Sequence, residues 1–394
     1  MTASVTGISL GSDERQEIVL SARKFAREKI TPNALDLGNT HDYPYELFDL
    51  LRETGYFGLG FPTEWGGLGL DLWTVCQVIE ELASASNTAA SMVIQQLQGT
   101  LPILIAGSDE LKSRFVPKLV AGEIRPAMAL SEPDAGSDVA GIKSLAIREG
   151  DDFVIDGRKV FITGASVAGV ITVYAKLQSG RSTSTIQGFA IPAGTAGMLV
   201  GRIEDKMGST ALPTCELVLD GCRVPASLAL GDPGQGFRAA MQVLERVRPL
   251  IAARSVGLAR GALEAAVAYM QEREAFEAPL AALQGLQFKV ADMAMSIEAS
   301  RGLVERACRA IEEGDPSANR YAAMAKCFAS DATMSVTIEA VQIFGGYGVM
   351  RDYPVEHRMR EAKVAQIVDG TNEVQRLVIA RDLLGSAARH TRKT

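Results

Sequence analysis

The spacing of apolar residues changes twice along this chain, and that change constrains the fold more than any other feature. Up to about residue 125, apolar side chains recur every three or four residues, which predicts amphipathic helices. Between residues 126 and 235, short runs rich in Val, Ile and Thr are separated by Gly and Asp, which predicts strands. After residue 236 long Ala-rich helical segments return. We therefore predict an α+β chain with an N-terminal α-helical domain (1–125), a middle β domain (126–235) and a C-terminal helical bundle (236–394).

The totals favour a soluble globular enzyme over several other classes of protein. The chain is 47% hydrophobic and 22% charged with a formal net charge of -7, which disfavours a nucleic-acid binder. It has no apolar run of bilayer length and no signal or transit pattern at its start, so we expect a cytoplasmic protein without a membrane partner. The five cysteines form no Cys-x-x-Cys pair and only three histidines accompany them, so we expect reduced thiols and no metal site.

Four segments carry motifs from which a function can be inferred, and they follow one another in order. They are residues 129–138 (ALSEPDAGSD), 157–164 (GRKVFITG), 273–293 (beginning REAF) and 341–376 (beginning VQIFGGYG, ending DGTNEVQR). Together these segments resemble the acyl-CoA dehydrogenase family, and the resemblance covers nearly the whole chain. It implies that the middle domain is β-barrel-like and that the C-terminal domain is a four-helix bundle. It also implies a homotetramer, built as a dimer of dimers.

The resemblance implies a flavoprotein that uses FAD to desaturate an acyl-CoA thioester between its α- and β-carbons. The reaction needs a base for the α-proton, a hydride acceptor, which is flavin N5, and stabilisation of charge on the thioester oxygen. In the family the base is a carboxylate before Gly-Thr in the last domain, a position held here by Asp369 and followed by Gly370. We expect Asp369 and Gly370 to contact the substrate, and an electron-transfer flavoprotein to accept the electrons.

Asp369 is also the clearest departure from the family pattern, because the usual residue there is Glu. Aspartate is shorter by one methylene, so its carboxylate reaches roughly 1.5 Å less far. We therefore expect a substrate that sits differently, not an inactive enzyme. Without the family register, an Asp before Gly-Thr is typical of a helix cap. Some branches of the family place the base on the helix that opens the last domain, but that register falls here on Val247, which cannot accept a proton.

Three further positions are expected near the CoA moiety. Glu245 and Arg248 match a family pair of an acid and an arginine that touches CoA, although the same spacing is typical of a solvated helix face. Ser137 is expected near the CoA pantetheine or the cofactor phosphates, since small residues let backbone N–H groups approach an anion.

Two groups of residues match the family's FAD contacts. The group beside the flavin ring comprises Met128, Leu130, Ser131, Gly136, Ser137, Phe161 and Thr163. The group at the pyrophosphate and adenine comprises Arg273, Phe276, Gln284, Gln342, Gly345, Gly346, Thr371 and Glu373. In the family part of the second group reaches the FAD of the neighbouring subunit, so a monomer is expected to bind FAD weakly. Glu277 and Ala278 replace the usual Gly-Lys, which leaves the path of that loop open.

The sequence leaves the acyl group open. No Lys or Arg occurs between Arg52 and Lys112, a stretch that helps line the acyl pocket in the family, so a decarboxylating glutaryl-type enzyme is disfavoured. Polar residues of that stretch either narrow the pocket or face solvent: Ser91, Gln95, Gln96 and Gln98. Family members with Asp at the base position include alicyclic acyl-CoA dehydrogenases and nitroalkane oxidases. An alicyclic, short or branched acyl-CoA therefore stays open, and the alternatives are a flavin oxidase and a non-catalytic family member.

Overall fold

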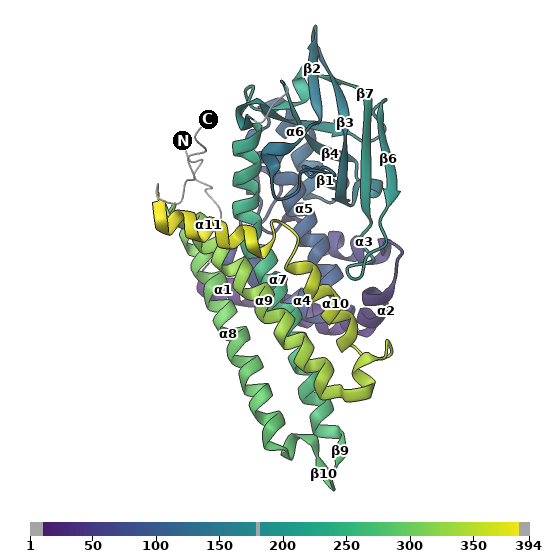
Figure 1. Cartoon of the computed structure of the whole chain (residues 1–394), viewed down its shortest axis with the longest axis vertical. Coiled ribbons are helices and arrows are strands. Elements are labelled where there is room, and N and C mark those ends of the chain that lie inside the picture. The colour runs from purple at the N-terminus through teal and green to yellow at the C-terminus, as the bar shows by residue number, and fades with distance from the viewer. Residues whose placement is uncertain (1–10, 179–181, 386–394) are drawn as a thin grey trace.

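The computed structural model describes residues 11–178 and 182–385 and places three regions along one long axis (Figure 1). A sheet of eight strands lies at one end, the C-terminal helices extend to the other, and the N-terminal helices pack between and beside them. The predicted α+β fold of helices, a β region and further helices is confirmed.

The N-terminal region contains α1 to α6, and side chains in its loops fix where the later helices begin. Asp71, Ser86 and Ser108 each accept a hydrogen bond from a backbone N–H of the first turn of α4, α5 and α6. The helices are α1 (Ser12–Phe25), α2 (Ala34–Asn39), α3 (Tyr45–Glu53), α4 (Leu72–Ala85), α5 (Asn87–Ala106) and α6 (Asp109–Val120).

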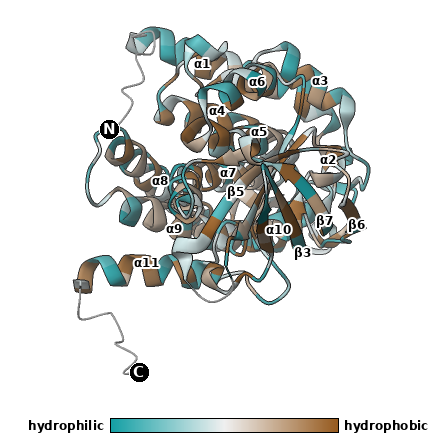
Figure 2. Cartoon of the chain, turned by 90° about the horizontal axis from the view of Figure 1, so that it is seen from above, coloured by the Kyte–Doolittle hydropathy of each residue, from teal (hydrophilic) through white to brown (hydrophobic). Residues whose placement is uncertain are grey.

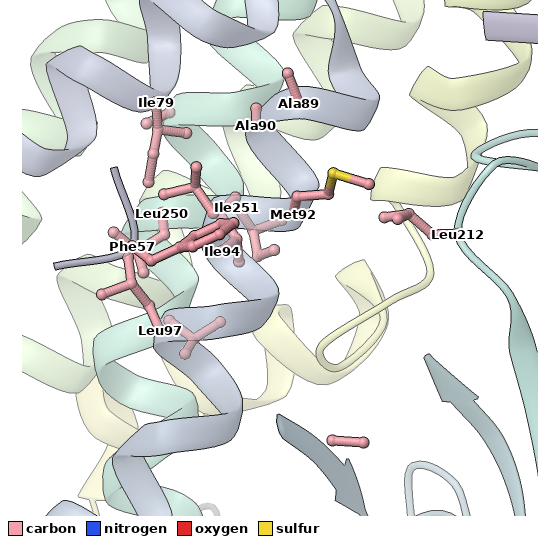
Figure 3. Packing of buried hydrophobic residues seen from close by; sticks show 14 of the residues in the cluster. Phe57, Ile79, Ala89, Ala90, Met92, Ile94, Leu97, Leu212, Leu250 and Ile251 are labelled. Atoms are coloured by element: carbon pink, nitrogen blue, oxygen red, sulfur yellow. The ribbon is translucent and has the colours of Figure 1, made fainter. Parts of the chain in front are cut away.

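By length and composition alone, α5 is apolar enough to cross a membrane, contrary to the expectation from the sequence. Most of its residues are buried inside the fold, however, against α4, α6 and α7. Figure 3 shows Ile94 and Leu97 of α5 packed against Leu250 and Ile251 of α7, with Phe57 beside them. Full burial of each such side chain contributes about 1.5–3 kcal/mol. We therefore assign α5 to the core, where it forms a rigid pair with α7.

The middle region is one mixed sheet that does not close on itself. Its order is β6-β7-β3-β2-β4-β5-β8, with β1 beside β4, and β2 meets β4 only at Leu145 and Lys176. The predicted barrel-like domain is thus an open sheet of two halves joined at that point. The strands are β1 (Pro126–Ala129), β2 (Leu145–Glu149), β3 (Asp152–Thr163), β4 (Val170–Lys176), β5 (Ile186–Pro192), β6 (Met198–Ile203), β7 (Thr214–Pro225) and β8 (Ala229–Leu230).

The C-terminal region has three long helices and two shorter ones within the described residues. The long helices α7, α8 and α9 pack on one another, and the short helices α10 and α11 pack on α9. Viewed from above, α11 projects beside α9, away from the N-terminal helices (Figure 2). The sequence had not separated α10 from its neighbours. The helices are α7 (Gly236–Glu272), α8 (Gln284–Glu312), α9 (Ala318–Phe344), α10 (Val355–Ala365) and α11 (Asn372–Leu384).

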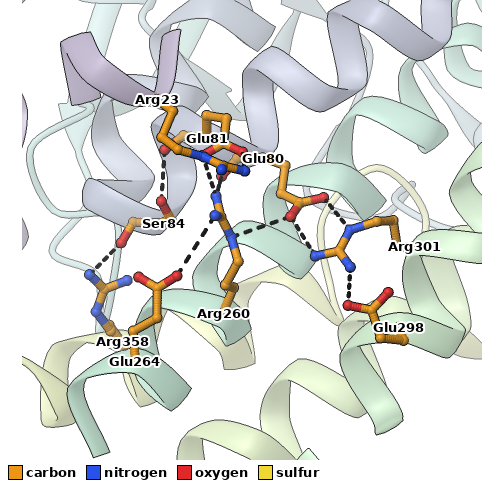
Figure 4. A network of polar contacts seen from close by, with 9 residues as sticks. All are labelled: Arg23, Glu80, Glu81, Ser84, Arg260, Glu264, Glu298, Arg301 and Arg358. Atoms are coloured by element: carbon orange, nitrogen blue, oxygen red, sulfur yellow. Dashed lines mark hydrogen bonds and ion pairs between the residues drawn. The ribbon is translucent and has the colours of Figure 1, made fainter. Parts of the chain in front are cut away.

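An ion network joins the N-terminal helices to this bundle (Figure 4). Glu81 of α4 pairs with Arg23 of α1 and Arg260 of α7, at 2.9 and 2.7 Å. The neighbouring Glu80 pairs with Arg301 of α8 at 2.7 Å and with Arg260 at 3.3 Å. Two carboxylates therefore bind arginines from three helices, and this paired junction (Arg23, Glu80, Glu81, Arg260, Arg301) fixes α4 against the bundle.

Candidate functional site

Asp369 lies on the turn between α10 and α11, in a backbone conformation that ordinary residues seldom adopt. Its φ is 54° and that of Gly370 is 88°, both in the left-handed region. Thr371, not Asp369, caps α11, because its hydroxyl accepts the N–H of Val374 at 3.3 Å. The helix-cap interpretation of Asp369 is therefore wrong. A non-glycine residue held in this conformation implies that its surroundings enforce the turn.

Lys326 of α9 supplies part of that enforcement. Its ammonium group donates to the carbonyl of Gly370 at 3.0 Å, to that of Gln366 at 3.3 Å and to Asn372 Oδ1 at 2.9 Å. Gln375 also donates to the Gly370 carbonyl, at 2.8 Å. Burial lowers the pKa of Lys326 to about 8, although the charge of Asp369 acts in the opposite direction. The buried ammonium group of Lys326 thus stabilises the turn by donating hydrogen bonds to its carbonyl groups.

The side chain of Asp369 is half-buried and only partly bonded. Gln98 Nε2 of α5 donates to Asp369 Oδ1 at 2.8 Å. Within the described residues, Oδ2 has no hydrogen-bond partner and the Asp369 backbone N–H donates to no carbonyl. One carboxylate oxygen and one backbone donor of the same residue therefore remain available to a ligand.

Two buried arginines of α7 lie within electrostatic range of Asp369. Arg248 donates to Asn319 Oδ1 at 2.5 Å, and Arg254 donates to Ser91 Oγ at 3.0 Å. Burial lowers the pKa of both guanidinium groups, and the charge of Asp369 opposes that shift in each case. Glu245 acts on Arg248 in the same direction as Asp369. Arg248 is therefore not part of a solvated helix face, and it lies in electrostatic range of both Glu245 and the predicted base.

The polar residues of α5 point inward, which answers the question that the sequence left open. The side chain of Gln96 is buried and donates to two backbone carbonyls, while Gln95 donates to the carbonyl of Thr163 at 3.3 Å. The solvent-facing alternative is wrong for these residues. Gly164 has a φ of 74°, which favours glycine, and a Cβ there would lie 1.8 Å from the Gln95 amide nitrogen, so any larger residue would displace Gln95.

The residues predicted at the flavin ring gather along β1, β3 and the loop after β1. Phe161 sits at a register shift of β3, has a φ of 61° and leaves 68% of its side chain exposed. The backbone carbonyl of Ser131 accepts the N–H of Val160 at 3.0 Å, which holds the loop against β3. Of the other predicted residues, Met128 and Leu130 are half-buried, and the exposed ones are Gly136, Ser137 and Thr163.

A buried ion pair joins the loop after β1 to β3. Lys159 Nζ lies 2.7 Å from Glu132 Oε1, and neither side chain reaches solvent appreciably. Burial lowers the pKa of Lys159 to about 8, and the charge of Glu132 acts the other way. Because Lys159 and the exposed ring of Phe161 are two residues apart, the pair fixes the strand that presents the ring.

The residues predicted at the pyrophosphate lie toward the opposite end of the long axis, near the hairpin labelled β9 and β10 in Figure 1. Arg273, Gly345 and Gly346 line one cavity of about 590 Å³ together with Tyr347. Both glycines have open space where a Cβ would be. The hairpin strands are β9 (Glu274–Ala275) and β10 (Ala278–Pro279).

The hairpin turn consists of Phe276 and Glu277, whose φ values are 55° and 65°. Two positive φ values in a two-residue hairpin loop are typical of a type I′ turn, which normally takes Asn-Gly. This turn leaves 90% of Phe276 exposed. The path that the sequence left open is thus a tight, strained turn that presents an aromatic ring to solvent. Gln284 and Gln342 are exposed on α8 and α9, and Thr371 and Glu373 open α11.

These residues fit FAD in their chemistry. An exposed, backbone-strained Phe161 offers an apolar wall to a flavin ring, and a guanidinium beside open glycines suits a pyrophosphate. The flavin-ring group lies on the sheet and the pyrophosphate group near the hairpin at the other end, whereas Thr371 and Glu373 lie at the start of α11, next to Asp369. That one FAD contacts two subunits stays a prediction.

Comparison with known proteins agrees with this site and fold. The acyl-CoA dehydrogenase N-terminal, middle and C-terminal domains match residues 12–123, 127–222 and 234–384. The chain is 39% identical to probable acyl-CoA dehydrogenase fadE25 of Mycobacterium leprae over 94% of its own length and 96% of that relative. It is 40% identical to cyclohexane-1-carbonyl-CoA dehydrogenase of Geobacter metallireducens, over 96% and 99%. Butyryl-CoA dehydrogenase of Megasphaera elsdenii has a TM-score of 0.91 at 38% identity, over 96% and 100%.

The fold and these similarities define an oxidoreductase that acts on acyl thioesters. The chain belongs to the acyl-CoA dehydrogenase family. The sequence analysis missed two residues that the structure brings near Asp369, Arg254 and Lys326, and it named Gln98 only as a polar residue of the acyl-pocket stretch. A signal for the two existed, because Arg254 and Lys326 each interrupt an apolar, Ala-rich helical run.

Proposed function

We propose that this chain carries out FAD-dependent α,β-dehydrogenation of an acyl-CoA thioester and that Asp369 is its base. The observation that carries the proposal is the state of Asp369: its turn is held by Lys326 and Gln375, while one carboxylate oxygen and its backbone N–H lack partners in the described part of the chain. A preorganised base beside a free donor is what removal of an α-proton from a thioester requires.

Each part of the site has one task in this proposal. Asp369 Oδ2 takes the α-proton, and Gln98 keeps the carboxylate oriented through Oδ1. The N–H of Asp369 donates to the thioester oxygen, on which negative charge develops. Glu245, Arg248, Ser137 and Gly370 bind the CoA thioester, and Arg248 brings a positive charge to it.

FAD, when bound, supplies the acceptor for the hydride that leaves the β-carbon. Phe161, Ser131 and Thr163 orient its ring, with Met128, Leu130, Gly136 and Ser137 around them. Arg273 and the open glycines Gly345 and Gly346 bind its pyrophosphate, and the other predicted contacts there are Phe276, Gln284, Gln342, Thr371 and Glu373. The proposal includes a homotetramer, a dimer of dimers, since the FAD contacts of one chain lie far apart. It also includes an electron-transfer flavoprotein as acceptor and a cytoplasmic location.

The substrate is proposed as an alicyclic, short or branched acyl-CoA. The similarity to cyclohexane-1-carbonyl-CoA dehydrogenase of Geobacter metallireducens favours the alicyclic member of that set. The shorter reach of Asp369 agrees with a substrate that sits differently from a straight chain.

Anaerobic mixing of the purified FAD-loaded enzyme with straight, branched, alicyclic and dicarboxylyl CoA thioesters and with a nitroalkane tests the proposal. We expect one thioester class to bleach the oxidised flavin. Asp369→Asn should slow that bleaching roughly 10³–10⁴-fold, because the amide cannot accept the proton. The exposed Asp36 provides the matched control, and Asp36→Asn should bleach at the wild-type rate.

Four results would contradict the proposal. Bleaching by the nitroalkane alone, or rapid reoxidation in air with release of peroxide, would establish a flavin oxidase. A purified protein that binds no added FAD would establish a non-catalytic family member. Equal rates of flavin bleaching for Asp369→Asn and the wild type would show that another residue is the base.

A further inference from the structure

Arg254 is a buried cation whose hydrogen-bonding capacity is mostly unused. Its side chain is 8% exposed, yet within the described residues its one hydrogen bond goes to the neutral hydroxyl of Ser91. It forms no ion pair there, although Asp369 and Glu361 both lie in electrostatic range. A guanidinium carries five N–H donors in a planar fork that matches a carboxylate. A buried arginine left in this state retains a strong site for an anion.

Arg254 also lies on the face of α7 that leads away from the base. Val247, Ile251 and Arg254 are spaced at i, i+4 and i+7, so they form one stripe, and all three are buried. Val247 occupies the position from which some family members present their base. Seven residues of helix rise about 10 Å, so Val247 and Arg254 lie about two turns apart on this buried face, and Arg254 is in electrostatic range of Asp369.

The helix opposite repeats this arrangement. Gln98 and Ser91 of α5 are seven residues apart, which is two turns, and therefore lie on the same face. Gln98 contacts Asp369 and Ser91 contacts Arg254. Along the facing sides of α5 and α7 the base thus contacts one level and the cation another, and the buried Ile94 and Ile251 lie between these levels in the sequence. Figure 3 shows Ile94 and Ile251 packed together.

This placement changes an inference drawn from the sequence. The absence of Lys and Arg between Arg52 and Lys112 disfavoured an acyl group with a terminal carboxylate. The structure brings a cation to that stretch from 163 residues further along the chain, because Arg254 contacts Ser91. The missing charge is supplied by α7 instead of α5.

We propose that Arg254, oriented by Ser91, binds a carboxylate at the end of the acyl tail, so that the substrate is a dicarboxylyl thioester. This inference rests on the proposed dehydrogenation, but it replaces the alicyclic acyl group that the Geobacter metallireducens relative favours with an acyl group that ends in a carboxylate. Arg254 is a specificity-determining residue here, and Asp369 remains the base.

Pairs of thioesters that differ only in the terminal group test this proposal with the wild-type enzyme. Glutaryl-, adipyl- and pimelyl-CoA are compared with 5-methylhexanoyl-, 6-methylheptanoyl- and 7-methyloctanoyl-CoA, in which an isopropyl group replaces each carboxylate. For the best-fitting length we expect kcat/KM for the carboxylate to exceed that of its neutral partner roughly 100-fold. A ratio near one, or below one, at every length would overturn the role of Arg254 and leave the dehydrogenase intact. Failure of all six to bleach bound flavin, with bleaching by an alicyclic thioester, would overturn the role of Arg254 alone, whereas failure of every thioester would overturn both proposals.

Variants separate recognition from packing. Arg254→Gln should reduce the carboxylate-to-neutral ratio roughly 100-fold, mostly through KM, and Ser91→Ala should reduce it by a smaller factor. Arg358 is an equally buried arginine that donates to the carbonyls of Ser84 and Ala85, so Arg358→Gln should lower the melting temperature without changing the ratio. If Arg254→Gln lowers the melting temperature and leaves the ratio unchanged, Arg254 is structural.

Discussion

Two buried glutamates of this protein have pKa shifts of opposite sign, and their surroundings explain why. Burial disfavours the charged form of Glu81, but the hydrogen bond from Arg23 and the charge of Arg260 outweigh it, so its pKa is lowered. Burial raises the pKa of Glu361 to about 7, because Arg358 offsets it only in part. Glu81 has two arginines within ion-pair distance, whereas Glu361 has none among the described residues.

The same contrast separates the paired junction from the surroundings of Asp369. At the junction each carboxylate contacts guanidinium groups from two other helices. Around Asp369 the cations Arg248, Arg254 and Lys326 are bonded to neutral oxygen atoms, and the carboxylate is bonded to an amide. Satisfied charges stabilise a fold, while buried charges without counter-ions mark a place where a ligand completes the pairing.

Among the tests of this contrast between paired and unpaired charges, we expect the largest effect on stability at Glu361. Its ordinary pKa is 4.5 and its folded pKa is about 7, so the folded state holds the proton more tightly. Stability is therefore full below about pH 4.5 and falls by about 3 kcal/mol as the pH rises through 7. Glu361→Gln should remove that loss, so the variant should melt higher than the wild type at pH 8 and equally at pH 5. A wild type that gains stability over this range would contradict the shift.

Next in size is the loss of the cation that holds the catalytic turn. Lys326→Met should reduce kcat roughly 100-fold with little change in KM, because the turn at Asp369 would no longer be held in its left-handed conformation. Stopped-flow flavin reduction measures this effect. Lys363 donates to the side chain of Gln366 near the same turn, and Lys363→Met should leave kcat unchanged. Equal kcat in both variants would show that Lys326 does not position the base.

A substitution in the paired junction should lower the unfolding free energy and leave the turnover rate unchanged. Glu81→Gln leaves Arg23 without its carboxylate and Arg260 with Glu80 and Glu264 as partners, and we expect a loss of about 2 kcal/mol in unfolding free energy. Turnover per folded molecule should not change. Glu305 forms an exposed pair with Arg309, so Glu305→Gln should cost less than about 0.5 kcal/mol. Urea unfolding of both variants makes the comparison, and equal losses would contradict it.

The smallest effect is expected where a neutral group contacts the base. Gln98→Met removes a single hydrogen bond to Asp369 Oδ1 and should slow flavin reduction roughly five- to tenfold. Gln95 lies on the same helix but donates to backbone carbonyls, so Gln95→Met should affect stability more than rate. A loss for Gln98→Met as large as that for Asp369→Asn would mean that Gln98 takes part in the chemistry itself.

Much of the fold could be predicted because it depends on local spacing. The change in the spacing of apolar residues predicted helices, then strands, then helices in the right order. Four motifs indicated the family. Local spacing did not separate α10, and it did not show that the sheet stays open, since closure depends on which distant strands pair. The candidate residues were assigned by their positions in the family's motifs, and their roles remain proposals. The structure does place Arg248 in electrostatic range of Asp369.

The sequence by itself determined the family, the candidate base and the residues expected at FAD, because those depend on residue types at fixed intervals. Tertiary structure alone decided which charges are paired. Lys326 lies 43 residues from Asp369 along the chain, and Ser91 and Arg254 are further apart still. Electrostatic energy depends on distance in space and on burial, and neither is encoded in the spacing of residues along one helix.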